Sequence, residues 1–299
     1  MQNEQKDRVD INPERLWNDL QELAKIGYRE GRGVSRPALS DSDMAAKAWH
    51  TDRIQAAGLA VRLDAAANVI GTLPATGRRP QKVLAIGSHL DTVPQGGKFE
   101  GALGVLAGLE CARVIREHGI ELPWDLEVIN FCDEEAAHNA GTVGSRAMLG
   151  QLQPGEIYVS KAKGSATFAE ALKRSGKDPQ KIHESVRDPN LFEAMLELHI
   201  EQGSRLESEG IRIGVVTGIV GIYRYIVTVK GEADHAGTTP MHLRNDAQSF
   251  ASHVPSGMVF IPCYKGKSHC PQESIEPQQA WDGCRVLLRT VLALARQHT

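Results

Sequence analysis

The sequence predicts an α/β fold with a mostly parallel central sheet flanked by helices. Short apolar runs alternate with helical patterns along its 299 residues, which is typical of sheets built from strand–helix–strand units. The runs at 82–87, 126–131 and 195–200 each end beside His, Asp or Glu side chains. Because ligands bind at the carboxyl ends of such strands, we expect the functional side chains to lie along one edge of the sheet.

The first half of the chain carries clear start and stop signals. Asn12-Pro13 begins a helix, since Asn is a favoured cap and Pro a favoured first residue. Asp41-Ser42-Asp43 caps a second helix that runs to about residue 57 and ends at Gly58. Further along, we expect a strand pair within 60–74, a buried strand at 82–87 and a helix over 101–118.

The second half continues the alternation. Apolar runs predict strands at 126–131, 195–200 and 257–262, with two more strands inside 213–231. The segment 153–190 is polar and weakly patterned. Helices are expected at 144–152, near 168–174, and from Pro277 onward, where apolar residues recur at helical spacing.

Composition excludes several classes of function. Hydrophobic residues make up 41% and charged residues 24% of the chain, and the net charge is −3, as in soluble globular proteins. We therefore expect neither nucleic acid nor a membrane as partner. The N-terminus lacks the apolar core of a signal peptide. Five scattered cysteines without a Cys-x-x-Cys pair predict reduced thiols and a cytoplasmic protein.

Metal-ligand residue types follow several predicted strands. In chain order they are His89 with Asp91, Asp133-Glu134-Glu135, His199 and His269, and Glu100 lies in a glycine-rich loop. Such a set suits zinc or manganese, and a shared carboxylate permits two ions close together. An adjacent glutamate pair could supply one ligand and one general base. Each piece alone also fits a solvated turn or a satisfied core histidine, but their placement at successive strand ends favours a metal site.

Two other chemistries have weaker support. The glycine-rich region 96–104 lacks the Gly-Lys-Ser/Thr ending of a phosphate loop, and its spacing differs from Gly-x-Gly-x-x-Gly. A serine hydrolase is also disfavoured, because the chain has no Gly-x-Ser-x-Gly elbow.

Several longer motifs resemble one family. The motifs are Gly-Ser-His-Leu-Asp-Thr-Val-Pro at 87–94, the glycine-rich segment 96–108, Asp-Glu-Glu at 133–135, Glu-Leu-His-Ile-Glu-Gln-Gly at 197–203, Gly-Glu-Ala-Asp-His-Ala-Gly-Thr-Thr-Pro-Met at 231–241 and Ser-His-Cys-Pro-Gln-Glu at 268–273. Together they look like the dinuclear-metal amidohydrolases of the M20 peptidase clan, on the branch of N-carbamoyl-L-amino-acid hydrolases, allantoate amidohydrolases and β-ureidopropionases.

The resemblance implies a metallopeptidase-like catalytic domain, two divalent ions and a set of roles. Asp91 matches the residue that orients the first histidine, and Glu134 matches the general base. Gln202 resembles a substrate contact. His235 resembles a lid histidine that polarises the scissile carbonyl, often from a neighbouring subunit of a homodimer. The positions that match metal ligands are His89, Glu100, Glu135, His199 and His269.

The chain departs from the family pattern in three respects. Glu100 stands where the family has a bridging Asp, so the loop must readjust or one metal binds poorly. Ala136 replaces a Gly, and Cys270-Pro271-Gln272 replaces Ser-Pro-Glu. By comparison with the family, we interpret Asp246-Ala247 as the junction of an internal deletion, which would remove most of the lid domain with the Asn and Arg that grip a substrate carboxylate. We therefore expect a catalytic domain over 1–210 and 247–299, a truncated α+β lid remnant over 211–246, and a weakened dimer.

These observations lead to three hypotheses. The first is a metal-dependent hydrolase of ureido or carbamoyl C–N bonds that releases ammonia. The second is a catalytically impaired remnant that binds metal or a full-length partner. The third, with less support, is an aminoacylase or peptidase of the same clan.

Overall fold

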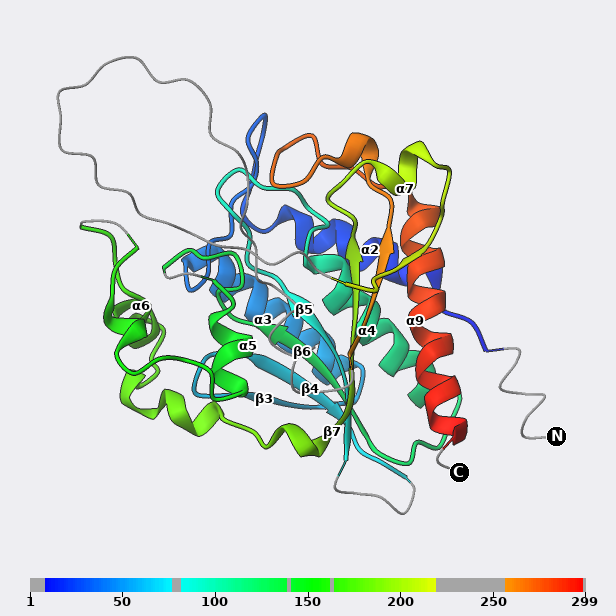
Figure 1. The fold of residues 1–299 in the computed structure, drawn as a ribbon, viewed down its shortest axis with the longest axis horizontal. Helices are drawn as coiled ribbons and strands as arrows, with labels where there is room; N and C mark the ends of the chain where they lie inside the picture. The colour runs from blue at the N-terminus through cyan, green and yellow to red at the C-terminus, as the bar shows by residue number, and fades with distance from the viewer. Residues whose placement is uncertain (1–8, 77–81, 139–140, 162–163, 219–255, 298–299) are drawn as a thin grey trace.

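The computed structural model describes residues 9–76, 82–138, 141–161, 164–218 and 256–297 (Figure 1). The predicted lid remnant lies outside the described residues beyond position 218. His235 and the junction near Asp246 also lie outside them.

Seven strands of the described chain form one mixed sheet in the order β3-β4-β6-β5-β7-β9-β8. The middle strands β6, β5, β7 and β9 pair in parallel, whereas β3, β4 and β8 add antiparallel pairings at the edges. The α/β fold class is thus confirmed, with its parallel part at the centre. The strands are β3 Ala60–Leu63, β4 Val69–Leu73, β5 Val83–His89, β6 Asp125–Phe131, β7 Phe192–Ile200, β8 Gly214–Val215 and β9 Ser256–Ile261, and β1 Tyr28–Arg29 pairs with β2 Gly33–Val34 separately.

The helices lie close to their predicted ranges. The predicted cap of α3, Asp41-Ser42-Asp43, is wrong. The N-cap is Ser40, whose side chain accepts a hydrogen bond from the backbone N–H of Asp43 at 3.3 Å. The helices are α2 Pro13–Lys25, α3 Asp41–Ala56, α4 Ala102–Glu117, α5 Val143–Met148, α6 Phe168–Arg174, α7 Arg205–Ser208 and α9 Pro277–Gln297, with 3-10 turns η1 Glu156–Tyr158, η2 Pro179–Ser185, η3 Pro189–Leu191 and η4 Tyr264–Gly266.

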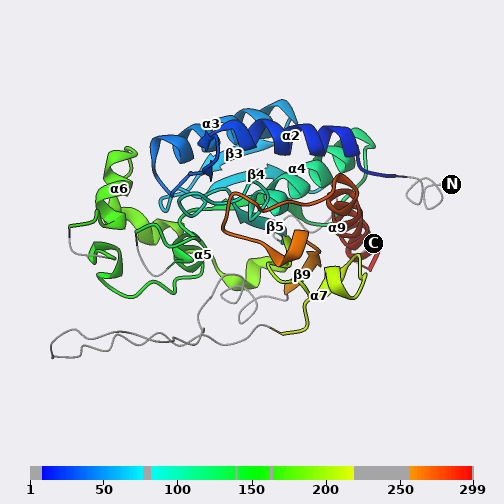
Figure 2. The same ribbon diagram turned by 90° about the horizontal axis from the view of Figure 1, so that it is seen from above.

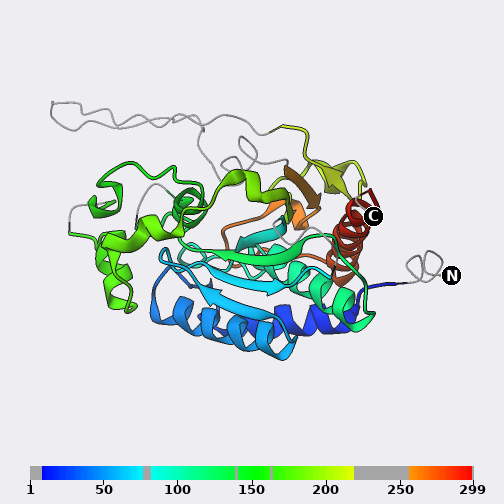
Figure 3. The same ribbon diagram turned by 90° about the horizontal axis from the view of Figure 1, so that it is seen from below.

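The central strands are buried on both faces, so they read as apolar runs rather than as alternating patterns. Leu84 and Ile86 of β5 pack in the larger core with α2, α4 and α9. Val83 and Ala85 point the other way, into a smaller core closed by Met148 of α5. Figures 2 and 3 show α2 and α3 along one side of the strands, and the green segment that carries α5 and α6 at one end of the sheet.

Helix α4 lies unusually close to the sheet. A Cβ atom added to Gly104 would lie 2.5 Å from the carbonyl oxygen of Leu198 in β7, so only glycine permits this approach. The close packing places the loop before α4 directly over the ends of β5 and β7. None of the described helices combines the length and apolar character needed to cross a membrane.

Candidate metal centre

Two buried histidines lie at the carboxyl ends of neighbouring parallel strands. His89 is the last residue of β5, and His199 is the penultimate residue of β7. The Nδ1 atom of His89 lies 2.9 Å from the carbonyl oxygen of Asp91, and that of His199 lies 2.8 Å from the carbonyl oxygen of Ile200. Because a carbonyl can only accept, both rings donate through Nδ1–H. In the neutral rings, Nε2 is therefore free to act as a metal ligand.

Both imidazoles face the carboxylate of Glu100. Its Oε1 atom lies 3.3 Å from Nε2 of His89 and 3.1 Å from Nε2 of His199. Burial alone would raise the pKa of Glu100, but when no metal is bound and both rings are protonated, the charge of His89 and the Nε2–H hydrogen bonds from both histidines hold that pKa well below its usual value. The next residue, Gly101, has φ +66°, and an added Cβ would lie 2.5 Å from the His89 ring. Glycine is thus required where the loop turns into α4.

A second group shares the same glutamate. Glu100, Glu135 and His269 place their ligand atoms within 4.8 Å of one another, as do Glu100, His89 and His199. Glu135 follows β6, and its Oε2 atom lies 3.2 Å from Nε2 of His269. The two groups thus come from three strand ends, the loop after η4 and the loop before α4, and this last loop supplies Glu100 to both.

The spacing of these atoms fits divalent metal ions. Ligands bound at about 2.0–2.2 Å around a tetrahedral ion lie roughly 3.3–3.6 Å apart. The contacts of Glu100 with His89 and His199, at 3.3 and 3.1 Å, are close to that spacing. Imidazole and carboxylate ligands suit zinc, manganese and related ions. A cation between these buried acceptors would also offset the repulsion among their lone pairs.

The glutamate pair after β6 is held by a dense set of hydrogen bonds. Glu134 is buried, and its carboxylate accepts from the backbone N–H of Ser145 at 3.0 Å and from its hydroxyl at 2.9 Å. Burial raises the pKa of Glu134 well above its usual value, against the opposing effect of these bonds. The carboxylate of Asp91 accepts from the backbone N–H groups of Glu134 at 3.4 Å and Glu135 at 3.0 Å.

Asp91 therefore contacts the site in two ways. Its carboxylate lies 3.8 Å from Nδ1 of His89, while its own backbone carbonyl makes the shorter contact with that ring. The carboxylate fixes the turn that carries Glu134 and Glu135, and the carbonyl fixes the orientation of His89. The resemblance assigns the orientation of the first histidine to Asp91, and in the structure the backbone carbonyl of this residue makes the shorter contact with the ring.

Gln202 lies over the second group. Its Nε2 atom is 3.1 Å from Oγ of Ser268, 3.1 Å from Nε2 of His269 and 3.5 Å from Oε1 of Glu100. Gln202 and His269 both have positive φ, at 56° and 57°, as does Asp133 at 57°. Left-handed backbone costs a non-glycine residue about 1–3 kcal/mol and is concentrated at functional sites.

Three supporting residues were not assigned a role from the sequence. Ser145 holds Glu134, and no local pattern marks it. Arg36 is fully buried and donates from Nε to the carbonyl oxygen of Leu90 at 2.6 Å, which braces the turn between His89 and Asp91. Glu273 lies within the matched segment 268–273, so its position in a motif was the one available signal.

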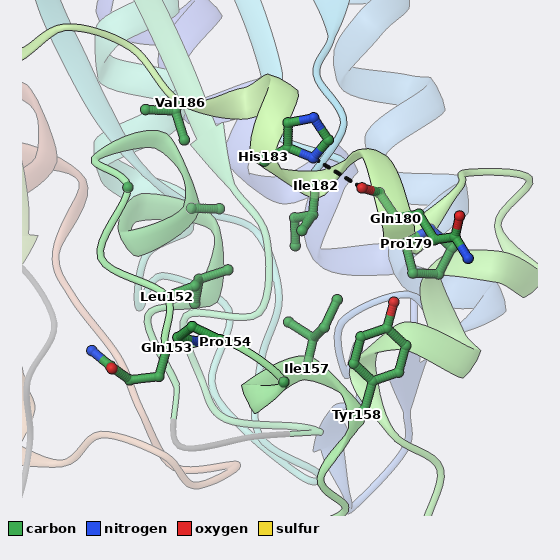
Figure 4. Close-up of a pocket in the computed structure, with 13 residues that line it drawn as sticks. Leu152, Gln153, Pro154, Ile157, Tyr158, Pro179, Gln180, Ile182, His183 and Val186 are labelled. Atoms are coloured by element: carbon green, nitrogen blue, oxygen red, sulfur yellow. Dashed lines mark hydrogen bonds between the residues drawn. The ribbon is translucent and has the colours of Figure 1, made fainter.

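A separate pocket of about 330 Å³ lies between α5, η1 and η2 (Figure 4). Its lining is mostly apolar and includes Leu152, Ile157, Tyr158 and Ile182. It contains none of the predicted site residues.

The family can now be assigned. The model of peptidase family M20/M25/M40 matches residues 85–240, which include most of the motifs at the strand ends. The chain belongs to this family.

Within this family, the chain is similar to curated amidohydrolases. An N-carbamoyl-L-amino acid amidohydrolase of Geobacillus stearothermophilus is 42% identical over 82% of this chain and 59% of its own length. The allantoate amidohydrolase of Bacillus subtilis is 34% identical over 78% of this chain and 56% of its own. The chain thus spans less than two thirds of the length of these relatives.

Solved structures show the same fold. An amidase of the hydantoinase/carbamoylase family from Burkholderia vietnamiensis aligns with a TM-score of 0.78 at 23% identity, covering 96% of this chain and 98% of its own.

Proposed function

We propose that this chain hydrolyses carbamoyl or ureido C–N bonds of small molecules and releases ammonia, using two divalent ions, zinc or manganese. The observation that carries the proposal is the sharing of Glu100 between two ligand groups, one with His89 and His199 and one with Glu135 and His269. The relatives named above as amidohydrolases of N-carbamoyl amino acids and allantoate support the substrate class.

The residues have distinct tasks in this proposal. When bound, the ions supply a water nucleophile at neutral pH and stabilise charge on the carbonyl oxygen. Glu134 takes the proton from the attacking water and returns it to the leaving nitrogen. Burial raises the pKa of Glu134 well above its usual value, and a raised pKa strengthens the affinity of a carboxylate for the proton it accepts as a general base. Ser145 keeps both carboxylate oxygens in a fixed orientation through two hydrogen bonds.

Substrate contacts come from two residues in the proposal. Gln202 can turn its amide from Ser268 and His269 toward a bound ureido group. His235, which lies outside the described residues, would polarise the scissile carbonyl, from a second subunit if the chain forms the family homodimer. The free state of the five cysteines suits a reducing compartment such as the cytoplasm.

The test is ammonia release by the purified chain. Metal-free protein is loaded with Mn²⁺ or Zn²⁺ and incubated with N-carbamoyl-L-amino acids or allantoate, with Glu134→Gln as the matched control. We expect metal-dependent ammonia release that the variant loses while it keeps its metal content. Two ions per chain without ammonia from any of these substrates would overturn the proposed reaction. Metal content near zero would overturn the metal site itself.

The second candidate, a metal-binding remnant without turnover, is favoured by one observation. The chain spans 59% of the Geobacillus relative's length, and we propose that the missing part is an internal piece of the lid. The same assay distinguishes the two candidates. A remnant without turnover would bind metal, release no ammonia and show no activity on the substrates of aminoacylases or peptidases. Ammonia-free cleavage of N-acetyl amino acids or dipeptides would instead favour those two activities.

A further inference from the structure

Glu273 is a buried carboxylate that the proposed reaction does not use. It is 3% exposed and lies after η4, in the last described segment of the chain. Its Oε1 atom accepts from the backbone N–H of Phe99 at 2.8 Å and from that of Glu100 at 3.1 Å. One oxygen therefore holds two successive amides of the loop that carries the shared ligand.

The fit between this carboxylate and the loop is tight. A Cβ atom added to Gly97 would lie 1.9 Å from the carboxyl carbon of Glu273 and 2.1 Å from each of its oxygens. Real Cβ contacts are never so short. The carboxylate of Glu273 can therefore lie against the loop only if residue 97 is glycine. Contact over this length orders the loop from Gly97 to Glu100 against a residue from the far end of the chain.

The same carboxylate is linked to the second ligand group. The hydroxyl of Ser268 donates to Oε2 of Glu273 at 3.4 Å, and Nε2 of Gln202 donates to that hydroxyl at 3.1 Å. Ser268 precedes His269 directly. Glu273 therefore lies between the backbone of Glu100 and the loop that presents His269, although it belongs to neither ligand group among the described residues.

We propose that Glu273 is a positioning residue that fixes the backbone of Glu100 and so places the carboxylate shared by the two ligand groups. The proposal rests on the metal site of the proposed function, but the ordering of the loop does not depend on a metal. Removing the acceptor leaves two buried N–H groups without a partner, which favours a different loop path. A Gln side chain at position 273 has the same length as Glu and keeps an oxygen that can accept these hydrogen bonds.

The first test compares Glu273→Leu with Glu273→Gln, with the exposed Glu276→Gln as the matched control. Calorimetric titration with Mn²⁺ measures affinity, and hydrogen exchange of the peptide containing 97–101 is measured on metal-free protein. We expect Glu273→Leu to bind Mn²⁺ at least tenfold more weakly and to exchange at least tenfold faster in this peptide. Glu273→Gln should stay within about threefold of the unmodified chain in both measurements. Wild-type exchange and affinity in Glu273→Leu would overturn the proposal.

The second test keeps the proposal falsifiable if Glu273→Leu does not fold. Gly97→Ala places a methyl group where the carboxylate lies, so it should weaken Mn²⁺ binding at least tenfold. Combined with Glu273→Ser, which vacates that space, the methyl group should add less than threefold to the loss caused by Glu273→Ser alone. Additive losses would show that the two residues do not act through one contact. If the unmodified chain binds no metal, the proposed function fails, while the exchange measurement still tests the loop.

Discussion

Replacing Glu100 by Asp tests the proposed shared ligand directly. The structure places Oε1 of Glu100 at 3.3 and 3.1 Å from the Nε2 atoms of His89 and His199. Asp is shorter by one carbon–carbon bond, about 1.5 Å, so both separations would grow to roughly 4.5 Å if the loop stays in place. Metal sites tolerate deviations of only about 0.2 Å in ligand distance. Glu273 and Gly101 restrict compensation by the loop.

We therefore expect Glu100→Asp to weaken binding of at least one ion by tenfold or more, which is about 1.4 kcal/mol. The assay is calorimetric titration of metal-free protein with Mn²⁺, followed by metal analysis after gel filtration. Glu100→Gln is the matched control, because it keeps the length and removes the charge. Equal or tighter binding of two ions by Glu100→Asp would refute the reasoning. That result would favour the sequence-based expectation that the extra methylene impairs the site.

Three further predictions concern other buried polar side chains, those of Glu134, His50 and Arg36. Glu134→Gln should lower the rate of ammonia release at least 10²-fold, the usual range for a general base, with unchanged metal content; equal loss of metal would point to a ligand role instead. Burial, reinforced by the cations Lys47 and Arg113, lowers the pKa of His50 to about 3, so the stability that the neutral ring contributes is complete above pH 6.5 and is lost as the pH falls. Urea unfolding of the unmodified chain from pH 7 to 5 should show a slope of up to about 1.4 kcal/mol per pH unit that is smaller in His50→Gln, and identical slopes would contradict this assignment. Arg36→Met should destabilise the chain by about 2–4 kcal/mol in the same assay, because two buried carbonyls and one partly buried carbonyl lose their donor, whereas a loss below about 0.5 kcal/mol would mean that the turn is stable without it.

The element pattern could be predicted well because the central strands are buried on both faces. The helix expected near 168–174 is α6 Phe168–Arg174, and the strand expected at 126–131 is β6 with one more residue. The antiparallel edges were harder to foresee, because β8 has only two residues and no periodicity identifies so short a strand.

The grouping of ligand residue types could also be predicted, because parallel strands bring their carboxyl ends to one edge. The supporting contacts could not. The hydrogen bonds of Glu273 with Phe99 and Glu100 span more than 170 positions, and nothing in the local sequence relates the two segments. The contact of Ser145 with Glu134 could not be predicted either. The two residues are close in sequence, but their spacing follows no helical or strand period.

The pairing of β8 with β9 has a consequence for how this protein tolerates changes in length. Val215 lies opposite Val259, and the backbone N–H of Val216 donates to the carbonyl oxygen of Met258 at 2.9 Å. The chain thus leaves the sheet and returns to it at the same point. Whatever lies between need only close a loop, and doubling the length of a loop costs only about 0.6 kcal/mol. The sheet can therefore accept inserts of very different size here without any change in the position of the candidate ligand residues, which makes this point a natural place for evolution, or an engineer, to exchange one insert for another.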